Sequence, residues 1–271
     1  MRKNIIILFA IALILFLVRE NIFIQQPSQI FKIEKELEKP ICCEKINPTI
    51  KIINEKNSKI RSFFCENVSV KIKQNSITSK VHGFIAYEKD LNFKLELSSL
   101  FGLELDMGSN SNLFWVWSKR MKPRSTMFFA NHKDLYKTRL KDPFVPMWIM
   151  GALGFQEISC NNIEIFETKK HLIVSRKVVS PNGKKLIKKT FIDKKSFLII
   201  GHYLYDYDGN EVIVMQISHL YDETLDKIYI RWNKENVIMS LNFKDPKINL
   251  KINSRVFGLP NYKNKINMGT D

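Results

Sequence analysis

An alternation of apolar and polar side chains on either side of an apolar turn most constrains how this chain can fold. In residues 91–98 every second side chain is apolar, and residues 103–108 repeat the pattern. A period of two is typical of antiparallel strands with one face in a core and one in water. The turn between them, Leu100-Phe101-Gly102, is apolar, whereas turns are normally polar. An apolar sheet face that stays open suits lipid, so this region favours an apolar-ligand or membrane function over bond-making chemistry.

Similar segments extend the pattern along the chain. Strands are predicted at about 63–74, 78–88, 91–98, 103–108, 112–118, 125–130, 162–168, 171–180, 185–194, 196–207, 211–221, 226–233 and 236–243. A helix is predicted at about 48–61, because Asn47 suits its N-cap and Pro48 its first turn. A short apolar helix at 143–154 interrupts the strands. The predicted fold class is mainly β with a few helices, with antiparallel strands and the short apolar helix over the concave face of the sheet.

The N-terminus resembles a targeting segment. Arg2 and Lys3 precede an uninterrupted apolar run, residues 5–18. As a helix this run spans ~21 Å, against about 30 Å of bilayer hydrocarbon, which suits a signal-peptide core. No small-residue cleavage site follows, so removal and retention as a membrane anchor both stay open. We expect an exported protein tethered to a membrane, with residues 1–24 as signal peptide or anchor, 25–45 as tether and 46–271 as one domain.

Composition and motifs argue against catalysis, metal binding and nucleic-acid binding. The net charge is +16, but the lysines are spread along the chain and form no basic stripe with interleaved aromatics. The sequence has no H-E-x-x-H, G-x-S-x-G, P-loop or G-x-G-x-x-G pattern. Asp206 and Asp208 flank a hairpin, where turn chemistry explains them. No catalytic residue, metal or cofactor is therefore expected.

The four cysteines do not point to a metal site either. Cys42, Cys43, Cys65 and Cys160 lack the C-x-x-C spacing of zinc ligands. After export, a Cys65–Cys160 disulfide and two free thiols are both compatible with the sequence.

The order of these segments resembles the LolA/LolB-like periplasmic carriers over about residues 46–268. The likeness rests on a first helix, a run of antiparallel strands, a helical insert, further strands and a closing F-x-x-P, Phe257-Gly258-Leu259-Pro260. It implies a single bent antiparallel sheet, an open half-barrel with helices covering its concave face, and an apolar cavity that holds lipoprotein acyl chains or other lipid. It also implies a place on the periplasmic side of the cell envelope, tethered to the inner or outer membrane. It also implies that the 99–102 turn projects and inserts Leu100 and Phe101 into a membrane, as in the membrane-bound receptor branch. Packing of Phe101 back onto its own sheet is the alternative.

The expected cavity wall combines the alternating strands with the apolar insert. Its candidate residues are Phe93, Leu95, Leu97, Leu103, Leu105, Trp115, Trp117 and Trp148. Strand 113–117 is apolar on both faces, so the face that it turns toward a ligand stays open. Nearby lysines, such as Lys94, are expected to attract anionic headgroups.

Two departures from the family pattern set limits on the resemblance. The arginine of the soluble carriers has no counterpart, because Lys71, Lys73, Lys80 and Lys94 stand in that region. The receptor's acylated cysteine also lacks a counterpart, since Pro40-Ile41-Cys42 does not fit that signal. Expected partners are acyl chains, a membrane surface and a soluble periplasmic carrier, with no nucleic acid. An envelope stress sensor or structural adaptor that binds protein through the same half-barrel is the alternative.

Overall fold

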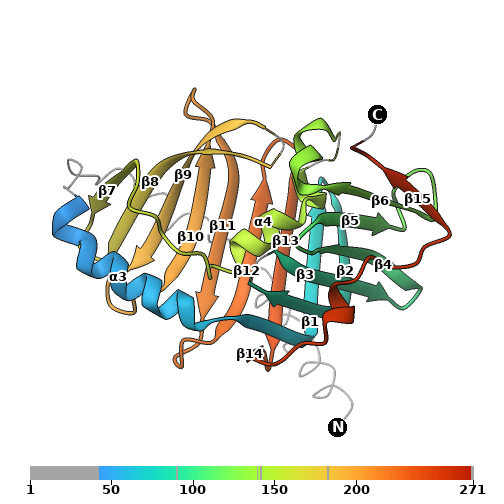
Figure 1. Ribbon diagram of the computed structural model, residues 1–271, viewed down its shortest axis with the longest axis horizontal. Helices are drawn as coiled ribbons and strands as arrows, with labels where there is room; N and C mark the ends of the chain where they lie inside the picture. Colours follow the sequence, from blue (N-terminus) through green and yellow to red (C-terminus); the bar gives the residue numbers. More distant parts are fainter. Residues whose placement is uncertain (1–42, 90, 139, 141, 182, 270–271) are drawn as a thin grey trace, which may run out of the picture.

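A 15-stranded sheet forms the framework of the protein (Figure 1). The computed structural model describes residues 43–269 except 90, 139, 141 and 182. The strands are β1 (Ser62–Gln74), β2 (Ile77–Glu88), β3 (Asn92–Ser99), β4 (Gly102–Ser109), β5 (Leu113–Ser118), β6 (Thr126–Asn131), β7 (Ile163–Glu167), β8 (His171–Val179), β9 (Lys185–Asp193), β10 (Ile199–Tyr205), β11 (Glu211–His219), β12 (Leu225–Trp232), β13 (Val237–Lys244), β14 (Lys247–Ile248) and β15 (Asn264–Asn267).

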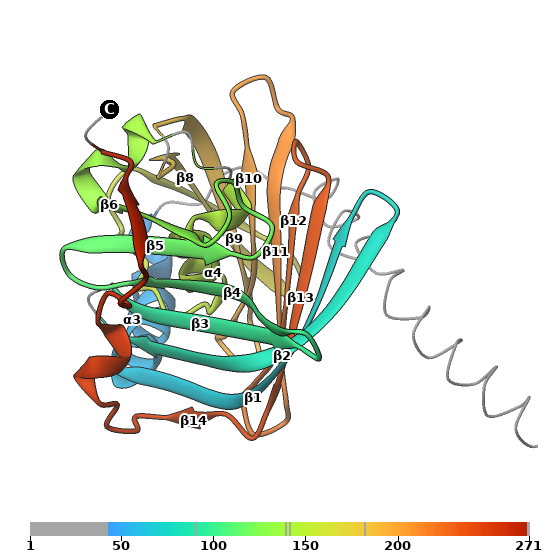
Figure 2. The same ribbon diagram turned by 90° about the vertical axis from the view of Figure 1, so that its right-hand side faces the viewer.

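The sheet bends where the first and last long strands meet. Its order is β15-β6-β5-β4-β3-β2-β1-β13-β12-β11-β10-β9-β8-β7, and β14 pairs with β1 beside this path. Figure 2 shows that the half containing β2–β6 stands at a steep angle to the half containing β8–β13. A bulge lies in β1 between Cys65 and Val68, and bulges bend the strand that carries them. The result is an open half-barrel, as the family resemblance implies.

The helical segments lie mostly within the concave side of this sheet (Figure 1). They are α3 (Cys43–Lys59), η2 (His132–Lys137), η3 (Asp142–Phe144), α4 (Pro146–Ala152) and, in the C-terminal segment, η4 (Ser254–Phe257). Ile50 and Ile53 bury one side of α3 in the main core. The Asn54 side chain forms two hydrogen bonds with the backbone of Ile158, at 2.8 and 2.9 Å, and these fix α3 to the segment after α4.

The C-terminal segment changes one prediction about the sheet. Strand β15 pairs with β6 in parallel, so the sheet is mixed and not wholly antiparallel. A parallel neighbour requires a long connection, and the chain between β6 and β15 spans residues 132–263. Its last part, from β14 past η4, brings β15 to the edge of the sheet. That connection was not predicted, because the short β15 carries no strong alternation of its own.

The first helix also differs from its predicted bounds. It begins at Cys43, so Pro48 lies inside it and Asn47 is not its N-cap. The predicted segment 1–24 and most of the tether lie outside the described residues. Within the part that the structure describes, no helix is both long and apolar enough to cross a bilayer. Cys65 is a buried free thiol and Cys160 an exposed one, so these two cysteines do not pair.

Candidate lipid-binding cavity

A cavity of about 1160 Å³ lies between the concave face of the sheet and the residues just before α4. Its floor comes from neighbouring strands, because Val237 and Met239 pair with β1, and Leu97 pairs with Leu105. Its roof consists of Thr138, Leu140, Asp142, Pro143 and Phe144. Further lining residues are Ile72, Gln74, Ser79, Val81, Ser118 and Met121. This volume is slightly above the usual range of small-molecule pockets, ~300–1000 Å³, and most of its walls are apolar.

An anchored carboxylate holds the roof in place. Asp142 is buried, and its Oδ1 accepts a hydrogen bond from the Trp148 indole N–H at 3.4 Å. Its Oδ2 forms an ion pair at 3.2 Å with the Nζ of Lys184, which lies in the β8–β9 connection. The Trp148 bond ties the roof to α4, and the Lys184 ion pair joins the insert to the second half of the sheet.

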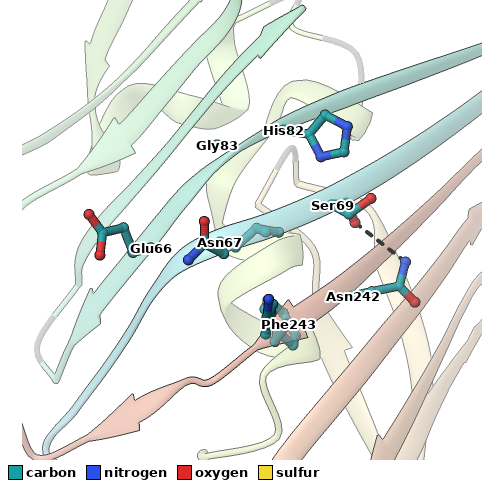
Figure 3. A pocket seen from close by; sticks show the side chains of 9 residues that line it. Glu66, Asn67, Ser69, His82, Gly83, Asn242 and Phe243 are labelled. Atoms are coloured by element: carbon teal, nitrogen blue, oxygen red, sulfur yellow. Dashed lines mark hydrogen bonds between the residues drawn. The ribbon is translucent and has the colours of Figure 1, made fainter.

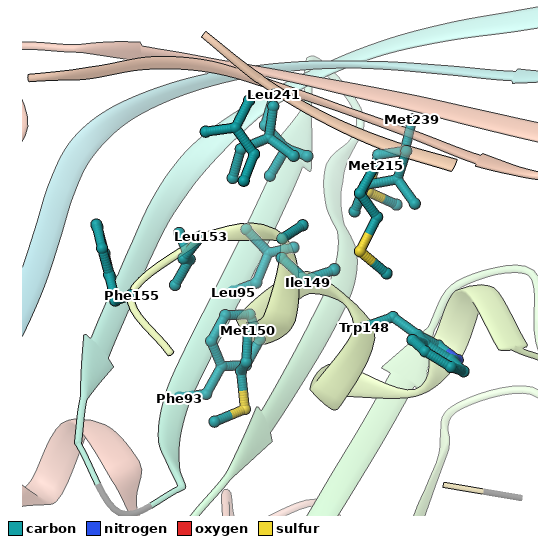
Figure 4. Packing of buried hydrophobic residues seen from close by; sticks show 14 of the residues in the cluster. Phe93, Leu95, Trp148, Ile149, Met150, Leu153, Phe155, Met215, Met239 and Leu241 are labelled. Atoms are coloured by element: carbon teal, nitrogen blue, oxygen red, sulfur yellow. The ribbon is translucent and has the colours of Figure 1, made fainter. Parts of the chain in front are cut away.

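Three of the candidate wall residues lie in packed core and not in the cavity. Phe93 and Leu95 are fully buried, and Trp148 is nearly so. Figure 4 shows Ile149, Met150 and Leu153 of the α4 region filling the space between these β3 side chains and Met215, Met239 and Leu241 of the second half. Helix α4 therefore packs over the middle of the concave face, in contact with β4, β11 and β12 (Figure 1), and the cavity lies beside it, with Leu97 in its lining.

The strand register turns both candidate tryptophans of β5 to the outer face. Trp115 pairs with Gly108, and Trp117 pairs with Asp106, whereas the intervening Val116 pairs with the core residue Met107. Trp115 donates its indole N–H to Asp106 Oδ1 at 3.3 Å. Trp117 stacks on Tyr262 of the C-terminal segment, with 5.5 Å between ring centroids. Trp115 and Trp117 thus belong to an outer-face cluster and do not contact the cavity.

Asp106 is the centre of this outer-face cluster, which comprises Lys94, Asp106, Trp115, Trp117 and Tyr262. Lys94 pairs with Asp106 at 2.5 Å, and the Tyr262 hydroxyl donates to the other carboxylate oxygen at 3.1 Å. Burial and the neighbouring Asp106 carboxylate raise the pKa of the Tyr262 hydroxyl, which stays protonated as a donor. Lys94 is buried in this cluster, so it does not offer a headgroup the free ammonium that the sequence suggested.

The predicted membrane turn projects from the β3–β4 hairpin at the mouth of the cavity. Leu100 is 100% exposed and Phe101 is 85% exposed, so neither side chain packs back onto the sheet. Gly102 has φ +96°, a conformation that suits glycine at this turn. The Phe101 N–H donates to Ser99 Oγ at 3.0 Å, and Lys119 Nζ donates to the Phe101 carbonyl at 3.1 Å. The tip is apolar, but its backbone is held in place. Leu103, which follows Gly102 on β4, is half-buried and pairs with Ser98 on β3.

Sequence reasoning found part of the cavity and missed the rest. Of the named cavity residues, Leu97 and Leu105 line the floor; Phe101, named for the membrane turn, also lies at the mouth. Sequence reasoning did not name Ile72 on β1, Val81 on β2 or Met239 on β13. The missing information was the pairing of β1 with β13, which brings the two ends of the domain together.

A second, smaller hollow of about 570 Å³ lies at the bulge of β1 (Figure 3). Ser69, His82 and Asn242 are cross-strand neighbours there, and the Asn242 side chain donates to the Ser69 carbonyl at 3.4 Å. The residues next to Ser69 and His82 on their strands, Val70 and Val81, point to the opposite face and belong to the core. The hollow is therefore on the outer face. The described residues hold no group of histidine, cysteine or carboxylate side chains with metal-binding geometry, here or elsewhere.

Comparison with known proteins finds solved structures with a similar fold but no matching family. No family model matches the sequence, and no curated protein matches it. A DUF1329 family protein from Desulfovibrio piger aligns over 79% of this chain and 97% of its own, with a TM-score of 0.52 at 7% identity. A LolA superfamily protein from Nitrosomonas europaea aligns over 77% and 97%, with a TM-score of 0.48 at 13% identity. A putative outer membrane lipoprotein-sorting protein domain from Vibrio parahaemolyticus aligns over 77% and 95%, with a TM-score of 0.43 at 10% identity.

The similarity to the DUF1329 protein shows a shared fold. The described chain is thus an open half-barrel whose concave face holds a largely apolar cavity and whose β3–β4 turn is apolar and exposed.

Proposed function

We propose that this protein binds acyl chains, of lipoproteins or other lipids, in the cavity under the insert and exchanges them with a membrane. The lining is largely apolar, and each methylene removed from water contributes about 0.8 kcal/mol. Leu100 and Phe101 insert into the bilayer and bring the mouth of the cavity to its surface. The protein acts on the periplasmic side of the cell envelope, held there by its N-terminus, and it exchanges cargo with a soluble carrier. No catalytic step is involved.

The observation that carries this proposal is the double position of Phe101. Its side chain is 85% exposed at the tip of the β3–β4 hairpin, and it also lines the mouth of the cavity. An exposed apolar tip alone indicates a binding surface of some kind. Because the tip and the cavity share one opening, an acyl chain that leaves the bilayer at this turn enters apolar surroundings directly.

Replacement of Phe101 with glutamate tests the membrane contact. Burial of a phenylalanine side chain among acyl chains contributes roughly 1.5–3 kcal/mol. We therefore expect Phe101→Glu to weaken vesicle binding at least tenfold. The thermal unfolding temperature is expected to change little, because the side chain is exposed in the folded protein. The measurement is vesicle co-flotation of a chain that lacks residues 1–42, whose folding is verified by its thermal transition.

Tyr221→Glu is the matched control. Tyr221 is a fully exposed aromatic residue in the β11–β12 hairpin. This hairpin lies at one end of β12, and the 233–236 hairpin beside the mouth lies at the other end. We expect this control to float with vesicles as the unmodified chain does. Equal effects of the two changes would contradict a specific role of the turn, and strong destabilisation by Phe101→Glu would assign Phe101 to the fold.

Delivery of acyl chains is measured with a fatty acid that carries an environment-sensitive fluorophore. We expect its fluorescence to report binding to the protein and its transfer to vesicles, and lipidated peptide to compete for the same cavity. If lipidated peptide never displaces the probe, the carrier function is wrong even when the turn binds membranes.

A further inference from the structure

Positive side chains surround the mouth of the cavity. Five basic residues are among its lining: Lys80, Arg120, Lys122, Lys184 and Lys234. Three acidic residues are present: Glu104, Asp142 and Glu235. Five positive charges against three negative charges give the lining a formal charge of +2. The apolar floor described above ends at this charged mouth, so the site as a whole has the polarity of an amphiphile.

Two of the three carboxylates already have partners within the protein. Glu104 accepts a hydrogen bond from Ser99 at 2.7 Å and pairs with Lys119 at 3.2 Å. The Ser99 hydroxyl, followed by Lys119, lowers the pKa of the Glu104 carboxyl, which is therefore ionised. Asp142 pairs with Lys184. These pairs leave Arg120, Lys122 and Lys234 at the mouth, and within the described ranges none of the three forms an ion pair.

Arg120 is exposed, and a hydrogen bond to strand β2 fixes its side chain at the mouth. Arg120 lies in the β5–β6 connection, and its Nη2 donates a hydrogen bond at 3.1 Å to the Oγ of Ser79 on β2. The guanidinium has further N–H donors, and its planar fork matches a carboxylate or a phosphate. Lys234 lies in the β12–β13 hairpin and Lys122 in the β5–β6 connection. Donors from two different connections therefore surround one opening.

We infer that the cavity takes a single anionic amphiphile, such as a fatty acid or a lipid with a phosphate headgroup. Its apolar chain lies against Leu97, Leu105 and Met239, and its anionic group is bound at the mouth by Arg120, Lys122 and Lys234. This inference rests on the proposed acyl-chain site and adds a preference for charge. A neutral acylated ligand fits the same floor but leaves these donors unmatched, so it binds more weakly.

A fluorescent fatty acid and its methyl ester test this inference, since they share one chain and differ in charge. The full chain is kept in a neutral detergent, which competes in the same way for every variant. We expect Arg120→Gln/Lys234→Gln to weaken binding of the acid about tenfold, the change expected for loss of charge-assisted hydrogen bonds. Binding of the ester is expected to change less than twofold. Lys51→Gln/Lys169→Gln, which removes two exposed lysines far from the mouth, is the matched control and should leave both affinities unchanged.

The possible outcomes separate this inference from the proposed function. Selective loss of acid binding in the mouth variant supports the inference. Tight binding of both probes that does not respond to the mouth variant would overturn it, while acyl-chain binding stands. Loss of binding to anionic vesicles without loss of the soluble acid would also overturn it, because the mouth would then be a membrane-docking surface. Failure of both probes to bind the unmodified protein would reject the acyl-chain site itself.

Discussion

Replacement of Asp106 with alanine is expected to destabilise the fold more than any change at the exposed turn. Asp106 lies on β4, on the face opposite the cavity, and its side chain is only 5% exposed. Three groups depend on it: the Lys94 ammonium at 2.5 Å, the Trp115 indole N–H at 3.3 Å and the Tyr262 hydroxyl at 3.1 Å. The side chain of Lys94 is itself only 8% exposed, so water cannot readily replace the lost carboxylate.

The magnitude follows from what the substitution leaves behind. Breaking a buried ion pair from one side typically costs about 3–5 kcal/mol, because it leaves an uncompensated charge. Glu96 remains 3.7 Å from Lys94, but it is 40% exposed and compensates only in part. We therefore expect a loss near the lower end, about 3 kcal/mol. This is a large share of the ~5–15 kcal/mol that stabilises a typical domain.

Urea denaturation followed by tryptophan fluorescence measures this loss, and a double variant separates its causes. Lys94→Met/Asp106→Leu removes both charges and is expected to recover much of the stability, because well-packed apolar residues often replace a buried pair without loss. A destabilisation below about 1 kcal/mol for Asp106→Ala would refute the reasoning that the pair is buried and matched. If the double variant is as unstable as Asp106→Ala, the loss of stability comes from altered packing and not from the unpaired Lys94 charge.

Two further changes test the interior. Leu105→Trp places a larger side chain in the cavity floor, so we expect acyl-probe affinity to fall at least tenfold with little change in the urea midpoint; unchanged probe binding would contradict the assigned site. His202 is 1% exposed, and burial lowers its pKa well below the usual value. Below pH ~6.5 the unfolded chain therefore binds a proton that the folded chain does not, and stability falls by up to about 1.4 kcal/mol per pH unit. His202→Gln should flatten the urea midpoint between pH 6.5 and 5, and an unchanged slope would contradict this assignment.

The sequence predicted the strands well because their alternation is local. Phe93, Leu95 and Leu97 are apolar at every second position, and all three face the core or the cavity. The division between core and cavity was not predictable, because it depends on how far α4 extends along the concave face. Leu97 lines the cavity and Leu95 does not, although both are fully buried and neither differs from the other in the sequence pattern.

The face assignment of β5 shows a second limit. Residues 113–117 are apolar throughout, so alternation cannot tell which side chains turn inward. The register against β4 decides this, since Trp117 pairs with Asp106. The residue that covers Trp117 is Tyr262, which lies 145 positions further along the chain in a segment without a strong pattern. Contacts of this range lie beyond what local periodicity can predict.

The outer-face cluster and the cavity are joined through one strand. Leu105 and Asp106 are neighbours on β4, and they face the cavity and the outer cluster respectively. The lining of an apolar cavity lacks packing partners on one side, so its walls tend to move inward unless other contacts hold them. The bonds of Asp106 to Trp115 and Tyr262 hold β4 from outside, and we expect them to keep the cavity open.

Tyr262→Phe tests this coupling with a minimal change. It removes the hydroxyl bonded to Asp106 and keeps the aromatic ring that stacks on Trp117. The free energy of unfolding should fall by about 1 kcal/mol, the typical contribution of one hydrogen bond. If the cluster braces the cavity wall, acyl-probe affinity also falls severalfold, although Tyr262 lies on the opposite face of the sheet from the lining. Unchanged probe affinity at the expected loss of stability would limit the cluster to fastening the C-terminal segment, and the cavity would owe its shape to the insert and the bend of the sheet alone.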